Sequence, residues 1–314
     1  MYTNEQEIED FLAEYQRSKV IIESTVRATL NRAVEFEYKF NKPFYQFTTA
    51  EALEMYKSIH AVSAVSLQNN NLILKHASKW FAHCGKEAAN DTYETMTKEL
   101  LSGVVDVNKQ KSMILSREDI DNLQGNLLNA IDRAILEMLF LGAGGLWLKE
   151  LTFLDQSQVD RKNNMIYFKT GKTIPVSDEV CDLLTEAFNE DELMSLGTTA
   201  RVSKVTGRWL YKIRCNALSD NSDWNNDEDV QRRYRFIQRR LMLISQDLGV
   251  KLTSGGVQSS GLLWHIQQKL NELGCDFREF VKTKSAKKLA RQYDIMSDEF
   301  YSQILLDKFS AYFE

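Results

Sequence analysis

The stretch Leu141-Gly-Ala-Gly-Gly-Leu-Trp-Leu-Lys-Glu-Leu-Thr-Phe-Leu154 places three glycines within four residues near the middle of the chain. The segment before it, Ile131–Leu141, is strongly apolar and predicts a buried helix. After it, Met165–Phe168 and Thr173–Val176 are short runs rich in β-branched and aromatic residues, joined by Lys169-Thr-Gly-Lys172. That pattern is typical of a β-hairpin. The sequence therefore predicts a helix, a glycine turn and a small sheet, in that order.

Helical patterns surround this centre. Ser116-Arg-Glu-Asp119 fits a capping box, in which a hydroxyl and a carboxylate satisfy free amides where a helix begins. A further helix is predicted from Asp178 to Phe188. The apolar positions between Val230 and Leu248 recur with a period near 3.6 residues, which predicts one long amphipathic helix. The segments that follow, to the end of the chain, have helical patterns as well.

The first hundred or so residues predict a helical domain. Thr48-Thr-Ala-Glu51 fits a second capping box, and Asn69-Asn70-Asn71 is read as a break before another helix. The polar stretch Gly103–Ser112 is the candidate linker. We predict a helical N-terminal domain at 1–102, a linker at 103–115 and a second domain at 116–314. The fold class is mainly α with a small β-sheet, α+β.

The composition is that of a globular protein without a membrane span. Of the 314 residues, 43% are hydrophobic and only 2 are proline, which favours a helix-rich chain. No apolar run reaches the roughly 18 residues of a membrane span, and the acidic N-terminus lacks the features of a signal peptide, so we expect a cytoplasmic protein. The 4 cysteines form no CxxC pair and the 4 histidines form no metal pattern. We therefore expect reduced thiols, no metal and no cofactor.

The glycine turn resembles the active-site turn of the tyrosine recombinases, the phage integrase family. In that family a Gly-Leu-Arg-x-x-Glu-Leu turn joins two helices. Here Gly145, Leu146, Glu150 and Leu151 keep the frame, and Trp147 stands where the arginine is expected. The resemblance implies a two-domain architecture, a helical core-binding-like domain followed by a catalytic-like domain.

The resemblance also assigns the positions of the family's chemistry, in which a tyrosine attacks a DNA phosphate held by two arginines. The hairpin lysine falls on Lys169, and the nucleophile falls on Tyr301. In Thr253–Ser260 the expected histidine is Gly255 and the second arginine is Gln258, and the later histidine falls on Gln292. The vestigial positions are therefore Lys169 and Tyr301, and the lost ones are Trp147, Gly255, Gln258 and Gln292. Without its arginines and histidines the chain is not expected to be an enzyme, and Tyr301 is then a structural aromatic.

Basic residues gather in three clusters, although the net charge of −5 taken alone argues mildly against nucleic acid. The clusters are Arg201–Arg214, with Lys204, Arg208 and Lys212; Gln231–Arg240, with five arginines; and Lys282–Arg291. Within the second cluster Arg232, Arg235 and Arg239 share a helix face. Such clusters in a recombinase-like domain favour phosphate contact. The predicted DNA contacts are Lys169, Lys172, Arg201, Lys204, Arg208, Arg232, Arg235, Arg239, Lys284, Lys287 and Lys288.

These observations favour a sequence-specific DNA-binding protein on an inactive recombinase scaffold. Such a chain resembles the master repressors of SPβ-type prophages, which implies repression of transcription at operator-like sites in double-stranded DNA. One alternative is an active, divergent integrase. Another is a phage regulatory module that binds protein and not DNA, which the overall acidity supports. A protein or peptide antagonist is a further partner that the sequence leaves open. Self-association through the C-terminal helical segment, Phe300–Phe313, is another, but packing within the same chain is the simpler prediction for that segment.

Overall fold

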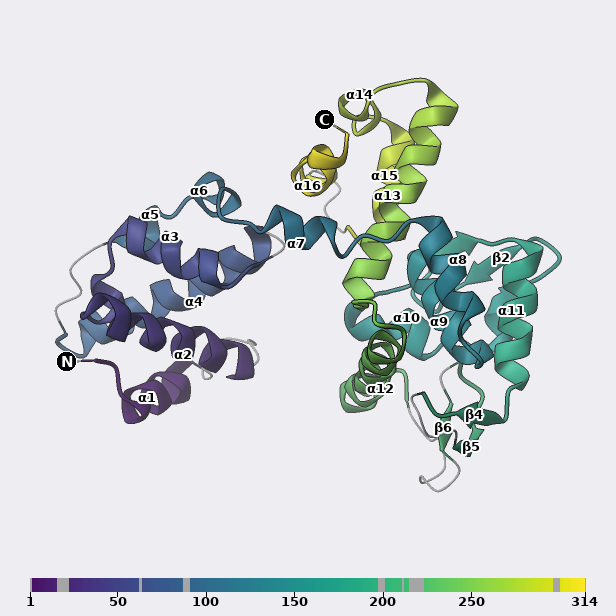
Figure 1. Cartoon of the computed structure of the whole chain (residues 1–314), viewed down its shortest axis with the longest axis horizontal. Coiled ribbons are helices and arrows are strands. Elements are labelled where there is room, and N and C mark those ends of the chain that lie inside the picture. The colour runs from purple at the N-terminus through teal and green to yellow at the C-terminus, as the bar shows by residue number, and fades with distance from the viewer. Residues whose placement is uncertain are drawn as a thin grey trace. The chain divides into compact units, whose positions relative to one another are not determined.

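The chain folds into two compact units, Met1–Ser112 and Met113–Glu314, in the computed structural model (Figure 1). The structure describes residues 2–15, 23–61, 64–86, 91–196, 201–210, 212–214, 223–295 and 300–313. The mainly helical class with a small amount of antiparallel sheet is confirmed. Within the described residues, no helix is both long enough and apolar enough to cross a membrane.

Unit 1 is built from helices around an aromatic core. Phe44, Tyr56 and Phe81 are buried at its centre. The capping box predicted at Thr48 is present, because the Thr48 hydroxyl accepts from the Glu51 amide and the Glu51 carboxylate accepts from the Thr48 amide. The helices are α1 (Glu5–Tyr15), α2 (Glu23–Phe40), η1 (Phe44–Gln46), α3 (Thr49–Ser58), α4 (Ala64–His83), α5 (Thr92–Thr95), α6 (Lys98–Ser102) and α7 (Val107–Lys111).

The predicted break at Asn69-Asn70-Asn71 is wrong, because α4 runs through all three residues. Asn71 bonds to other elements and not to its own backbone. It is buried, accepts from the Tyr56 hydroxyl at 2.9 Å and donates to the Tyr93 carbonyl at 2.9 Å. These tertiary bonds outweigh the weak helix propensity of asparagine.

The boundary between the units, after Ser112, falls inside the segment predicted as a linker, 103–115. That segment is not irregular throughout, because it contains the short helix α7. The side chain of Asp106 begins α7 by accepting from the Lys109 amide at 2.8 Å.

Unit 2 is organised around helix α9 (Ala130–Phe140), in which every residue but Arg133 is buried. The predicted buried helix is therefore confirmed. Helices α11 (Asp178–Asn189) and α13 (Ser254–Leu273) both pack against α9 (Figure 1). The helices of unit 2 are α8 (Arg117–Gly125), α9, η2 (Leu146–Leu148), α10 (Lys149–Thr152), η3 (Gln156–Gln158), α11 (Asp178–Asn189), α12 (Asp227–Leu248), α13 (Ser254–Leu273), α14 (Phe277–Phe280), α15 (Lys284–Gln292), α16 (Tyr301–Phe309) and η4 (Ser310–Tyr312).

The predicted hairpin is confirmed as part of a three-stranded antiparallel sheet in the order β1-β2-β3. Its strands are β1 (Val159–Asp160), β2 (Met165–Tyr167) and β3 (Thr173–Pro175), with Ile166 opposite Ile174. Gly171 in the turn has a φ of 85°, a conformation that glycine adopts without strain.

A second antiparallel sheet lies where the sequence indicated only a basic cluster. It consists of β4 (Glu192–Met194), β5 (Val202–Thr206) and β6 (Ile213–Arg214), in the order β4-β5-β6. In β5 only Val205 is fully buried, so the alternation that would reveal a strand is weak. Because these strands are short and lie among charged residues, the sequence pattern did not predict the sheet.

Helix α12 confirms the predicted long amphipathic helix and ends at Gly249, with φ 65°. Two of its arginines, however, lie on the buried face. Arg240 makes a double hydrogen bond to the Asp132 carboxylate, both at 2.6 Å, and the Arg233 Nε donates to the Thr152 carbonyl at 3.0 Å. The arginine cluster of this helix is therefore divided between the core and the surface.

Candidate nucleic-acid interface at the glycine turn

The glycine turn, residues 141–145, follows the end of α9, and its carbonyls are bonded by side chains from elsewhere in unit 2. Four consecutive carbonyls, those of residues 140–143, each accept a hydrogen bond. The pairs are the Tyr293 hydroxyl with Phe140, Gln292 Nε2 with Leu141 (2.8 Å), Lys172 Nζ with Gly142 (3.0 Å) and Gln258 Nε2 with Ala143 (2.9 Å). Carbonyls at a helix end need such partners when they are buried. These bonds hold the backbone of the turn in place.

The amides of the turn face two carboxylates. The Gly144 amide donates to Glu150 at 2.8 Å, and the Gly145 amide donates to Asp294 at 2.7 Å. A Cβ on Gly144 would lie 2.5 Å from an Asp294 oxygen and 2.6 Å from the Gln258 amide nitrogen. A side chain at this position would therefore displace the Asp294 and Gln258 groups that bond the turn.

Lys172 lies between these two carboxylates. Its Nζ is 2.7 Å from Glu150 and 2.8 Å from Asp294, and its side chain is only 11% exposed. The Thr170 hydroxyl donates to the second Glu150 oxygen at 2.7 Å. Lys172, and not Lys169, is thus the hairpin lysine that reaches the glycine turn. Its charge is matched by two carboxylates, so little of it is available for the DNA contact predicted from the sequence.

Lys169, to which the sequence assigned the hairpin position, is exposed and lies over the Trp209 ring, 4.5 Å from its centroid. Trp147, at the position of the expected arginine, is half-buried and has a positive φ of 58°. Its ring meets Tyr234 edge-on at 5.4 Å. An aromatic residue is uncommon in this left-handed conformation, so the packing around Trp147 must hold it there.

The remaining positions do not converge on one point. Gln258 and Gln292 are both at the glycine turn. Gly255 lies in the first turn of α13, and a Cβ added to it would meet nothing within 4 Å. Tyr301 begins α16, packs against the C-terminal core cluster and donates to the Thr283 carbonyl at 3.4 Å.

Sequence reasoning missed three groups at the turn, Asp294, Tyr293 and His265. The Tyr293 hydroxyl lies 2.8 Å from His265 Nδ1, which is also 2.8 Å from the Gly261 carbonyl. Burial lowers the pKa of His265 and raises the pKa of Tyr293 well above its usual value. Only their nearness in sequence to Gln292 could have drawn attention to Tyr293 and Asp294, because the contacts span more than a hundred residues.

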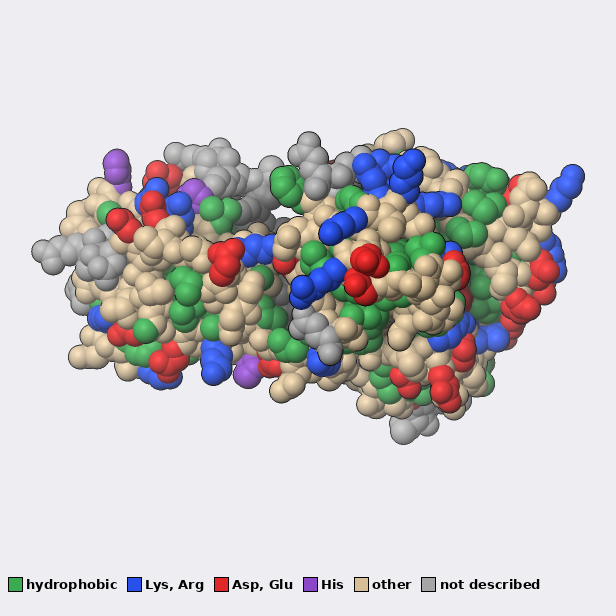
Figure 2. Space-filling view, turned by 90° about the horizontal axis from the view of Figure 1, so that it is seen from above, with side chains coloured by type: hydrophobic (Ala, Val, Ile, Leu, Met, Phe, Trp, Pro, Cys, Tyr) green, Lys and Arg blue, Asp and Glu red, His purple; other side chains and the backbone are tan. Residues whose placement is uncertain are grey.

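The exposed predicted DNA contacts lie on three elements. Arg201, Lys204 and Arg208 surround β5; Arg232, Arg235 and Arg239 lie on the outer face of α12; and Lys284 and Lys288 lie on α15, where Lys287 is half-buried. Arg232 also pairs with Asp229 at 2.5 Å. Figure 2 shows Lys and Arg side chains gathered on part of the face it presents.

Lys212, which the sequence placed in the first basic cluster, is buried. Its ammonium donates to the carbonyls of Phe188 and Glu190, and desolvation lowers its pKa. It therefore supports the fold and not a surface. The side chain of Arg214 lies outside the described residues, as does Cys215.

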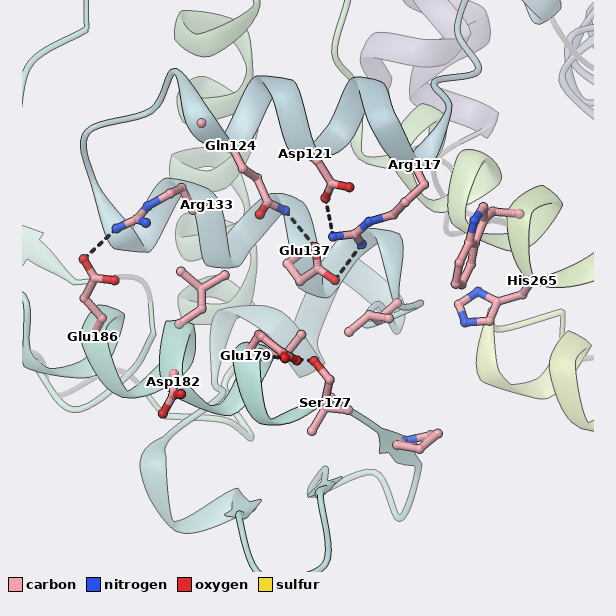
Figure 3. Close-up of a pocket in the computed structure, with 17 residues that line it drawn as sticks. Arg117, Asp121, Gln124, Arg133, Glu137, Ser177, Glu179, Asp182, Glu186 and His265 are labelled. Carbon is pink, nitrogen blue, oxygen red and sulfur yellow. Dashed lines mark hydrogen bonds and ion pairs between the residues drawn. The ribbon is translucent and has the colours of Figure 1, made fainter. Parts of the chain in front are cut away.

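A cavity of about 970 Å³ lies among α8, α9, α11 and α13. Figure 3 shows Glu137 at its centre, bonded by Arg117 at 2.8 Å and Gln124 at 2.7 Å, with Arg133 paired to Glu186 at one side. None of the predicted DNA contacts is among the described residues that line this cavity. Within the described part of the chain there is also no group of three or more His, Cys, Asp or Glu that could hold a metal ion.

Comparison with known proteins gives one family and several relatives. The family described as MrpR, C-terminal catalytic domain, matches residues 114–310. The SPbeta prophage-derived uncharacterized protein YopR of Bacillus subtilis (strain 168) is 24% identical over 263 residues, which cover 79% of this chain and 78% of that protein. The Tn1549 transposon integrase in complex with a circular intermediate DNA is 14% identical, with a TM-score of 0.47, over 96% of this chain and 94% of that chain. The crystal structure of XerA recombinase is 15% identical, with a TM-score of 0.35, over 96% of this chain and 98% of that chain.

The family match covers well over half of the chain and the whole of the region that holds the glycine turn. The tyrosine-recombinase-like fold expected from the sequence is confirmed. The chain belongs to the family described as MrpR, C-terminal catalytic domain.

Proposed function

We propose that this protein binds double-stranded DNA without cutting it and represses transcription at the sites that it occupies. One observation carries the proposal. The positions at which a recombinase would hold the scissile phosphate are occupied by side chains that bond the glycine turn or pack beside it.

Gln258 and Gln292 use their amide groups on the carbonyls of the turn, and Trp147 packs against Tyr234. None of the three carries a positive charge. Removing one donor that stabilises developing negative charge typically lowers the rate by about 10² to 10³. With both arginine positions neutral, strand cleavage should be undetectable. Although the family is described as catalytic, this chain lacks the charge for that activity at these positions.

The glycine turn is also electrostatically unsuited to a phosphate. Lys172 is its cation, and the carboxylates of Glu150 and Asp294 both lie within 2.8 Å of it. This group of three charges is therefore negative overall, and it would repel a phosphate brought close to it.

The exposed cations of β5, α12 and α15 support DNA binding. Arg235 and Arg239 are both exposed and lie one turn apart on the same face of α12, so both guanidiniums can contact a phosphate backbone. Such contacts position a protein on DNA but do not read sequence. The 24% identity to a prophage-derived protein supports a prophage origin, and repression is the role that the resemblance to prophage repressors implies.

The test is a genome-wide pull-down of DNA with the tagged protein from a bacterial host, followed by retention and cleavage assays on the recovered fragments. We expect discrete, intact sites that are retained equally by wild type and by the Tyr301→Phe variant. Transcription from a promoter that contains such a site should fall when the protein is present. Nicked or covalently attached DNA that disappears in Tyr301→Phe would establish an active recombinase. No enrichment of DNA would instead favour a protein-binding module.

A further inference from the structure

Three cations from three different segments converge on two tryptophans in unit 2. Lys149 begins α10 and is half-buried, and its Nζ lies 4.6 Å from the centroid of the Trp224 ring. Lys169 is exposed and lies 4.5 Å from Trp209 and 5.8 Å from Trp224. The guanidinium of Arg208, also exposed, lies 4.0 Å from Trp209. No sequence pattern indicates this grouping, because the three residues are far apart along the chain.

A buried phenylalanine packs against both tryptophans. Phe153 is fully buried and meets Trp209 edge-on at 5.0 Å and Trp224 edge-on at 5.7 Å. The buried guanidinium of Arg233 lies 5.3 Å from Phe153. Trp147, at the lost arginine position, packs against the same cluster. The cations therefore rest on a fixed aromatic base directly beside the position at which the family's arginine is missing.

No carboxylate of the described residues forms an ion pair with any of these three cations. The acidic groups next to the tryptophans bond elsewhere. The Asp155 carboxylate accepts from the Ser157 amide at 3.0 Å, and the Asp223 carboxylate accepts from the Asn225 amide at 2.9 Å. Three like charges at one aromatic surface repel one another, and a bound anion would relieve that repulsion.

We propose that Lys149, Lys169 and Arg208 form a binding site for the phosphodiester backbone of duplex DNA. The site rests on the proposed function and names a contact region within it. An arginine and two lysines match the oxygens of a phosphodiester, and the tryptophan faces hold the side chains so that less conformational entropy is lost on binding. In a tyrosine recombinase the phosphate is held at the glycine turn. In this protein, the proposed phosphate site lies on the surface beside that turn.

The test measures the affinity of the full chain for a fluorescent, random-sequence duplex of roughly 30 base pairs across roughly 50 to 200 mM salt. The variant is Lys149→Gln, Lys169→Gln and Arg208→Gln together. We expect an affinity about tenfold weaker at intermediate salt, and a slope of log Kd against log salt that is smaller by about 2 to 3, because three phosphate contacts are lost. The control, Lys162→Gln, Lys251→Gln and Lys269→Gln together, removes the same charge elsewhere in unit 2 and should change the affinity by about twofold or less.

A second variant separates charge from packing. Lys149→Arg with Lys169→Arg keeps both positive charges over the rings, so it should bind the duplex more tightly than the triple glutamine variant does. If wild type binds the duplex and the first variant weakens binding no more than the control, the site is wrong and the proposed function stands. If wild type does not bind duplex DNA at low salt, both are wrong.

Discussion

Single side chains decide what the glycine turn can do. Gln258, Gln292 and Lys172 each donate to a carbonyl of the turn, and Glu150 and Asp294 each accept from one of its amides. A residue that bonds the protein's own backbone is not free to bond a substrate. The polar groups of the turn therefore act as structural supports.

Lys172→Met should destabilise unit 2 strongly. The substitution leaves Glu150, whose side chain is 2% exposed, and Asp294 as neighbouring carboxylates without a cation. Breaking a buried pair in this way typically costs about 3 to 5 kcal/mol. Urea unfolding followed by tryptophan fluorescence measures the loss. The control is Lys169→Met on the same hairpin, which removes only an exposed contact with the tryptophans and should cost about 1 kcal/mol or less. Equal losses would show that Lys172 is not the cation that holds the turn together.

His265 should make stability depend on pH in the mildly acidic range. Burial lowers the pKa of His265 in the folded protein. Between that lowered pKa and the value near 6.5 in the unfolded chain, the unfolded state binds more protons, so stability falls as the pH falls through this range. The melting temperature should therefore drop between about pH 7.5 and about pH 5.5, and less so in His265→Asn. His83→Asn, which changes an exposed histidine of unit 1, should keep the wild-type slope. The same slope in both variants would contradict this role of His265.

At the scale of elements, the approach of α13 to α9 depends on one glycine. A Cβ on Gly261 would lie 1.7 Å from the Phe140 carbonyl oxygen and 2.7 Å from the Tyr293 hydroxyl. The two helices touch at this point, next to the end of α9 from which the glycine turn begins. The position of α13, and with it that of Gln258, follows from this contact.

Gly261→Ala should destabilise unit 2 by at least about 3 kcal/mol, because the backbone of α9 must move to admit the methyl group. Gly255→Ala is the matched control, since it makes the same change on the same helix where a Cβ meets nothing within 4 Å. Gly255→Ala should not destabilise unit 2. It should raise the free energy of unfolding by about 1 kcal/mol or less, because alanine has a higher helix propensity than glycine. Thermal unfolding by circular dichroism compares the two, and a similar stability in both variants would contradict the close packing at Gly261.

What the sequence could predict depends on how local the cause is. The apolar run of α9, the hairpin and the amphipathic period of α12 are local patterns, and all three are present. The continuation of α4 through Asn71 depends on bonds to Tyr56 and Tyr93, which a linear pattern does not contain. The same holds for the site. The absence of arginine at Trp147 is visible in the sequence, but the partners of Lys172 are not, because Asp294 lies more than a hundred residues away.

At the scale of the whole molecule, each unit has a hydrophobic core of its own. Unit 1 buries Phe44, Tyr56 and Phe81 together, and unit 2 buries α9 with the strands and helices around it. Chains with separate cores commonly unfold in more than one step. Four of the five tryptophans, Trp147, Trp209, Trp224 and Trp264, belong to unit 2, so tryptophan fluorescence reports mainly on that unit.

Calorimetry should therefore resolve two transitions, and a substitution in one core should shift only one of them. Phe44→Ala removes a fully buried ring from unit 1, which typically costs about 3 to 5 kcal/mol, and should lower the unit 1 transition, to which only Trp80 contributes fluorescence. Gly261→Ala should lower the other transition and leave the first unchanged, because Gly261, Phe140 and Tyr293 all lie in unit 2. A single transition lowered by both variants would mean that the two cores unfold as one cooperative unit. In that case a destabilising substitution in unit 1 would also destabilise the glycine turn in unit 2. Weaker DNA binding by such a variant would then not show that the substituted residue contacts DNA.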